Sequence, residues 1–163
     1  AHGAVRYHTL QEIIHRFVHT VCGGGNYLLN FGPMGNGQID PKALELFQGV
    51  GAWIQDNGES IYGTQANPLP DRPAWGDANV SNDGKTLYLH VMKWPKDRKL
   101  TVEGMPGKAT SASFLSPQAA DTKIACVQKG EKLHLTLPCT AIDPNDTVVK
   151  VSLAAPFHPK TKP

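Results

Sequence analysis

Three prolines close together divide this chain of 163 residues into two parts that cannot share one continuous element. Pro68, Pro70 and Pro73 lack backbone N–H donors and have a fixed φ, so neither a helix nor a central strand can run through residues 65–76. Before this segment the apolar residues recur at helical spacing, and after it they alternate with a period of two. The predicted divisions are an α/β part at 1–64, a linker at 65–76, a β-sandwich at 77–155 and a tail at 156–163.

The part before the linker begins with the pattern of an amphipathic helix. Thr9 and Glu12 have the spacing of a capping box, in which the two side chains satisfy free amides at a helix start. The apolar positions that follow lie on one face, which must pack against a larger body. They are Leu10, Ile13, Ile14, Phe17, Val18 and Val21. We expect the helix to end at the glycines of residues 23–25.

A short apolar run and a second helix follow. Residues 26–31 are almost continuously hydrophobic, which is typical of a strand covered on both faces, as in a parallel sheet. Asp40 and Pro41 predict the N-cap and first turn of a helix. Its expected buried face is Leu44, Phe47, Gly51 and Ile54. A helix–strand–helix unit cannot cover both faces of one strand, so this part is predicted to be the end of a larger α/β domain.

The part after the linker has the pattern of an antiparallel β-sandwich. Residues 86–91 alternate in hydrophobicity, which predicts a half-buried strand. Further strands separated by turn residues are predicted at 100–102, 109–115, 123–127, 133–137 and 147–153. Cys126 and Cys139 fall on neighbouring predicted strands, which leaves open either a cross-strand disulfide or two buried free thiols.

Composition and spacing argue against several classes of partner. The net charge is only +2 and the basic residues are scattered, so we expect no nucleic-acid interface. The apolar runs are far shorter than the roughly 20 residues of a membrane-spanning helix, so no membrane segment is expected. The three cysteines do not match a metal-ligand spacing, and no metal site is predicted.

Several short motifs, taken in their order, resemble one family. They are the runs at 24–33, 35–37, 51–54 and 57–63, followed by those at 86–95 and 146–153. In this order they are similar to the closing segment of glycoside hydrolase family 29, the α-L-fucosidases. The resemblance implies that the α/β part is the last strand and helices of a (β/α)-barrel catalytic domain. It also implies that the sandwich is the carboxyl-terminal domain of that family.

The resemblance implies a retaining enzyme that removes terminal α-L-fucose from glycans with two carboxylates about 5 Å apart. In the family both carboxylates come from earlier barrel strands, so we expect no catalytic residue in this chain, and little activity from it alone. This piece would brace the barrel and border the cleft. The implied partners are an amino-terminal catalytic portion, a fucosylated glycan and, in a homo-oligomer, further copies. No cofactor is implied, and the implied location is extracellular, periplasmic or lysosomal.

Two residues are candidates for contact with the substrate. His2 stands beside Gly3 where the family has an aromatic residue in a loop near the sugar. Asn30 falls at the carboxyl end of the predicted barrel strand, where barrel active sites gather. Each has an alternative interpretation: His2 as an ordinary loop histidine, and Asn30 as a residue that makes backbone hydrogen bonds at a strand end.

Other residues with reactive side chains have ordinary structural roles in the prediction. Glu12 and Asp40 are caps, and Glu59 belongs to a turn. The remaining carboxylates of the first part, Glu45 and Asp56, are predicted to lie on the solvated side of the second helix. His15 and His19 share a helix face, but no third ligand is apparent, so we expect a polar face. His90 is predicted to face solvent or the other part of the chain.

Two alternatives belong to other functional classes. A free-standing carbohydrate-binding module would need an exposed aromatic row, for which Tyr88 and Trp94 are the only candidates. A structural domain that has lost catalysis would need no such row. Trp53 and Trp75 are expected to pack rather than to stack on sugars. The residues encoded upstream of Ala1 would discriminate, since an enzyme requires a barrel strand that ends in the nucleophilic aspartate.

Overall fold

The computed structural model describes residues 7–157 and contains two long helices and two antiparallel sheets. The helices are α1 (Leu10–Cys22) and α2 (Pro41–Asn57), with short 3-10 turns η1 (Gly58–Ser60) and η2 (Pro117–Ala119). The strands are β1 (Thr64–Gln65), β2 (Gly76–Ser81), β3 (Thr86–Val91), β4 (Lys99–Val102), β5 (Ala109–Phe114), β6 (Ala125–Lys129), β7 (Lys132–Thr136) and β8 (Thr147–Leu153). No helix among these residues is long and apolar enough to cross a membrane.

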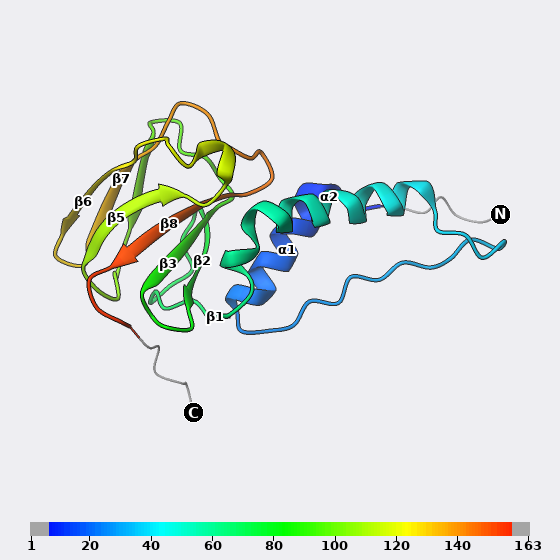
Figure 1. Ribbon diagram of the computed structural model, residues 1–163, viewed down its shortest axis with the longest axis horizontal. Helices are drawn as coiled ribbons and strands as arrows, with labels where there is room; N and C mark the ends of the chain where they lie inside the picture. Colours follow the sequence, from blue (N-terminus) through cyan, green and yellow to red (C-terminus); the bar gives the residue numbers. More distant parts are fainter. Residues whose placement is uncertain (1–6, 158–163) are drawn as a thin grey trace.

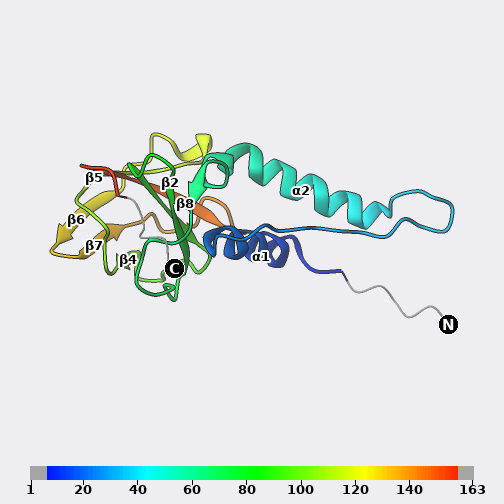
Figure 2. The same ribbon diagram turned by 90° about the horizontal axis from the view of Figure 1, so that it is seen from below.

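The two sheets pack face to face as the predicted sandwich. One sheet has the order β1-β2-β3-β8-β5 and the other the order β4-β7-β6. The apolar residues between them include Leu89, Leu133 and Val151, all fully buried. In both views the sandwich occupies one end of the molecule and the helices lie at the other (Figures 1 and 2).

Both helices begin where the capping residues predict. The Thr9 hydroxyl accepts a hydrogen bond from the Glu12 amide, and the Glu12 carboxylate accepts one from the Thr9 amide, which completes the capping box. The Asp40 carboxylate caps α2 by accepting from the amides of Lys42 and Ala43. Gly23 is the C-cap of α1, as expected.

A second apolar core lies between the helices and the five-stranded sheet. It joins Ile14 and Val18 of α1 and Trp53 of α2 to Tyr88 and Val148 of the sheet. Strand β3 is therefore buried on both faces, and the prediction that it is half-buried was wrong. The period of two holds, but its second face is covered by the helical layer instead of water.

The buried face of α2 is offset by one residue from the predicted one. Ala43, Leu46 and Trp53 are buried, whereas Leu44 is 45% exposed. The large indole of Trp53 reaches the sheet, and its N–H donates to the carbonyl of Asp146 at 3.1 Å. This pairing turns the helix so that the row containing Trp53 faces inward and Leu44 faces out.

Some details differ from the predictions. Residues 26–31 are extended, and no strand among residues 7–157 pairs with them, while Leu28 is 88% exposed. A parallel strand needs neighbours for its backbone groups, and the described residues offer none here. Strand β2 was missed, because its sequence has no clear alternation. The three cysteines are free, and Cys139 is exposed rather than buried.

Candidate functional site

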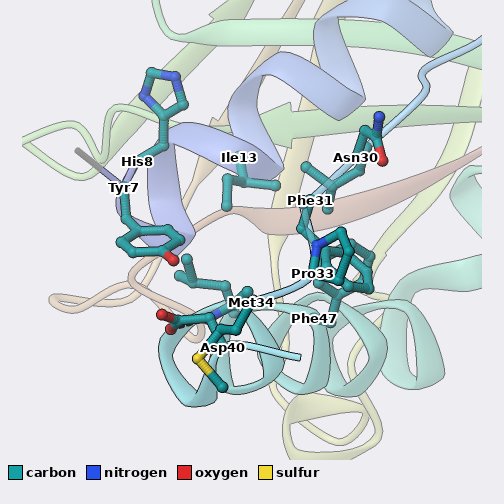
Figure 3. A pocket seen from close by; sticks show the side chains of 13 residues that line it. Tyr7, His8, Ile13, Asn30, Phe31, Pro33, Met34, Asp40 and Phe47 are labelled. Carbon is teal, nitrogen blue, oxygen red and sulfur yellow. Dashed lines mark hydrogen bonds between the residues drawn. The ribbon is translucent and has the colours of Figure 1, made fainter. Parts of the chain in front are cut away.

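A hollow lies between α1, α2 and the extended segment 29–34 (Figure 3). Its volume is about 530 Å³. Most of the lining is apolar, including Ile13, Leu29 and Leu46, and its polar groups come from Tyr7, His8, Asn30 and Asp40. A concave, mainly apolar site of this size with few polar groups is typical of a ligand or docking site.

Aromatic contacts hold the extended segment against the helices. The ring of Tyr27 lies 5.8 Å from that of Phe17 on α1, and the ring of Phe31 lies 4.9 Å from that of Phe47 on α2. Because side chains alternate along an extended chain, Leu28 and Asn30 lie on the opposite face. Asn30 is exposed, and Figure 3 shows its amide directed away from α2.

Of the two predicted substrate contacts, the structure describes only Asn30. Asn30 is among the residues that line the hollow, and along the extended segment it lies on the face opposite to Tyr27 and Phe31. His2 lies outside the described residues. Tyr7 and Asp40 lie at the other side of the hollow, and partial burial and the nearby Asp40 carboxylate raise the pKa of the Tyr7 hydroxyl.

The carboxylates of the first part mostly have the structural roles that were expected. Glu12 and Asp40 cap helices, and Glu45 forms an exposed ion pair with Lys42 at 2.8 Å. Glu59 has a larger role than a turn residue. Its carboxylate accepts hydrogen bonds from the Tyr88 hydroxyl at 2.8 Å and the Lys150 ammonium at 2.6 Å, and so links η1 to β3 and β8.

A set of polar contacts that sequence reasoning missed joins the helices to the sandwich. His90 and Asp146 are both fully buried, and the Nδ1–Oδ2 distance between them is 2.7 Å. On α1, His15 contacts the carbonyl of Asn145 at 2.6 Å, and His19 contacts the carboxylate of Asp77 at 3.3 Å. The expected polar face of α1 therefore faces the sandwich, and His90 faces the helical layer. The only sequence signal was the placement of aspartates at strand starts.

Glu59 makes one of these links dependent on pH. Burial raises the pKa of this carboxyl, but the hydrogen bonds from Lys150 and Tyr88 outweigh it, so that the pKa is lowered overall. A lowered folded-state pKa stabilises the fold above the unfolded value of about 4.3, and this contribution is lost as the pH falls through the folded value.

Replacement of Glu59 by glutamine is expected to lower the free energy of unfolding at neutral pH by less than about 1 kcal/mol, because half of the side chain is exposed. Urea denaturation followed by circular dichroism at neutral pH and in acid measures the difference. The two proteins should converge in acid, where Glu59 of the parent is protonated. A difference that persists unchanged there would contradict the role of the ionised carboxylate.

Comparison with known proteins gives a consistent result. The family model of the α-L-fucosidases matches residues 2–59. Human tissue α-L-fucosidase is 38% identical over 96 residues, which cover 56% of this chain and 20% of the human protein. The α-L-fucosidase of Branchiostoma floridae is 31% identical over 136 residues, which cover 81% of this chain and 29% of that protein.

The fold of the chain is also similar to that of solved α-L-fucosidase structures. The structure of α-L-fucosidase isoenzyme 1 from Paenibacillus thiaminolyticus has a TM-score of 0.78 and 28% identity, and the match covers 90% of this chain and 35% of that chain. Helices and sandwich together have the fold found in this group of proteins. The chain's family is glycoside hydrolase family 29, the α-L-fucosidases, of which it carries the carboxyl-terminal portion. The chain spans 20% of the human relative's length and 29% of the Branchiostoma relative's length.

The structure does not favour the alternative of a carbohydrate-binding module built on Tyr88 and Trp94. Tyr88 is only 3% exposed, and its hydroxyl is bonded to Glu59. Trp94 packs on Phe114 with the rings 6.4 Å apart, and its indole N–H donates to the carbonyl of Pro138. These two side chains form no exposed aromatic row.

Proposed function

We propose that this chain is the carboxyl-terminal part of a retaining α-L-fucosidase that hydrolyses terminal α-L-fucose from glycans. Its catalytic carboxylates come from an amino-terminal portion. In this proposal residues 1–64 end the (β/α)-barrel, residues 65–76 are the linker, residues 77–155 form the sandwich domain, and residues 156–163 are a tail. The family membership of the relatives supports the activity.

The observation that carries the proposal is that residues 26–31 form an extended segment with helices on one side and no paired strand. The segment is extended and is fastened to both helices through Tyr27 and Phe31, but no described strand pairs with it. A strand of a (β/α)-barrel contacts helices in this way on its outer face, while the side chains of its inner face point into the barrel interior. Leu28 and Asn30 would be the inner pair. Asn30, near the carboxyl end, would then border the cleft, and His2 is proposed as a second contact.

The sandwich serves in this proposal as a brace for the end of the barrel. The contacts that join the layers come from several places, including Trp53 to Asp146, Glu59 to Tyr88, and His19 to Asp77. Since these links come from α1, α2 and η1 and reach β2, β3 and the residue before β8, the sandwich and the helices are expected to move as one body. The helices in turn support the extended segment and the cleft.

Hydrolysis of a nitrophenyl α-L-fucoside tests this function. The longer protein that includes the amino-terminal portion should turn over the substrate, and this chain alone should not. Replacement of Asn30 by alanine in the longer protein is expected to lower kcat/KM by about tenfold to a hundredfold, as for a lost hydrogen bond to a sugar hydroxyl.

Asn36 supplies the matched control for that variant. Its amide bonds to Gln38 within the exposed loop, so that Asn36→Ala should leave kcat/KM close to that of the parent. Turnover by this chain alone, abolished by one carboxylate substitution, would contradict the proposal. Inactivity of the longer protein toward every fucoside tried would do the same.

The proposed location follows from the proposed substrate. The relatives include tissue and plasma α-L-fucosidases. A glycan-degrading enzyme of this kind would act outside the cell, in a periplasm or in a lysosome. Association of several copies into a homo-oligomer is part of the same proposal, and sedimentation of the longer protein measures it.

A further inference from the structure

A second hollow lies on the sandwich. It is formed between the linker residues 69–75 and the turns that follow β4 and β6, and its volume is about 510 Å³. Trp75 forms part of its wall, and polar side chains come from Asp71, Arg72, Glu103 and Glu131. We call this hollow the linker groove.

The wall of the linker groove is held in place by several contacts. The indole N–H of Trp75 donates to the carbonyl of Thr101 on β4 at 3.1 Å. Gly104 has a φ of +66°, and a Cβ on it would come within 2.4 Å of Pro70, so only glycine allows the turn to lie against this proline. Leu69 is buried in the sandwich core. The prolines therefore make a rigid wall, and little ordering would be needed on binding.

The chemistry of the linker groove suits a neutral sugar ring. A pyranose presents an apolar face that packs on an aromatic ring, and hydroxyls that hydrogen-bond to planar polar groups. Trp75 packs on the sandwich core, as expected, but it is only partly buried and also lines the groove. The carboxylates of Asp71, Glu103 and Glu131 supply acceptors, while Arg72 has its Nε and Nη2 on the Asp77 carboxylate. The Lys132 ammonium bonded to Glu103 lowers the pKa of that carboxyl, which stays ionised as an acceptor.

We propose that the linker groove binds a neutral pyranose of a glycan chain as a non-catalytic site. This goes beyond the proposed hydrolysis, because the site lies on the sandwich and needs no part of the barrel. Acidic glycans are disfavoured, since three of the four charged groups are carboxylates. The site would hold part of a glycan to the enzyme apart from the fucose being cleaved.

Titration of the ¹⁵N-labelled chain with 2′-fucosyllactose, lactose and L-fucose, followed by NMR, tests the proposal. The chain has three tryptophans, and each gives its own indole N–H signal. The Trp75 signal is expected to shift in a saturable way with at least one of these sugars. Those of Trp53 and Trp94 should stay in place, because their N–H groups are bonded to Asp146 and Pro138 outside the groove. Trp75→Phe assigns the signal.

Glutamine variants test the polar groups without disturbing the fold. Glu103 and Glu131 are exposed, and the double change to glutamine should weaken binding about tenfold, equivalent to 1.4 kcal/mol. Glu45→Gln, on α2, should leave the affinity unchanged. The proposal is overturned if none of the three sugars shifts the Trp75 signal in a saturable way, or if all three indole signals shift equally. It is also overturned if the double change to glutamine leaves the affinity unchanged. Because binding is measured on this chain, failure here is distinct from failure to hydrolyse a fucoside.

Discussion

Replacement of Asp146 by alanine is expected to lower the free energy of unfolding by about 1–3 kcal/mol, as for a buried polar group that loses its hydrogen-bond partner. Asp146 and His90 are fully buried and separated by 2.7 Å. Without the carboxylate, the Nδ1 of His90 would lose its hydrogen-bond partner, and its Nε2 already has none among the described residues. Urea denaturation followed by circular dichroism measures the change.

The matched control is Glu45→Ala, which removes a carboxylate from an ion pair of similar length. The pair with Lys42 is 2.8 Å long, but both side chains are largely exposed. We expect a cost of about 0–1 kcal/mol, as for other surface pairs. Equal costs for the two variants would show that burial does not govern the Asp146 contact.

Replacement of Trp53 by alanine is expected to cost about 3–5 kcal/mol, as for large aromatic residues removed from a core. Trp53 is 3% exposed, packs near the rings of Phe17 and His90, and donates its N–H to Asp146. The variant would leave a cavity between the helices and the sheet. Thermal or urea unfolding should therefore show the loss in one shared transition of helices and sandwich.

Leu44→Ala provides the control on the same helix and decides between two faces of α2. The hydrophobic pattern predicted that Leu44 is buried, whereas the structure leaves it 45% exposed. We expect a change within about 0.5 kcal/mol. A large cost for Leu44→Ala together with a small cost for Trp53→Ala would mean that the predicted face is the buried one.

Features determined by neighbouring residues could be predicted from the sequence. The capping box of Thr9 and Glu12 begins α1 and Asp40 begins α2, because a cap depends on groups only two or three residues away. Strands β3, β5 and β8 lie at or within a residue of their predicted bounds, since each has its own alternation and its own turns. The order of the motifs was enough to predict the family.

Features that depend on distant partners could not be predicted. Strand β2 has a weak pattern, and only its pairing with β3 defines it. Strand β6 begins at Ala125 rather than at residue 123, because its register follows from pairing with β7. His90 was expected to face solvent or another part of the chain, but periodicity could not show that Asp146 and Trp53 surround it.

The proline-rich linker has some features that the local sequence determines and others that depend on tertiary contacts. The sequence by itself determined that no helix or central strand passes through residues 65–76, because proline has a fixed φ and no N–H. It also determined where helices start and where strands alternate, since these depend on local groups. Only the tertiary structure decided that Pro70 lies against Gly104, that Trp75 faces a groove, and that aspartates 77 and 146 meet histidines from other elements. Such contacts join residues far apart in the chain, and their energy depends on burial that exists only after the layers have packed.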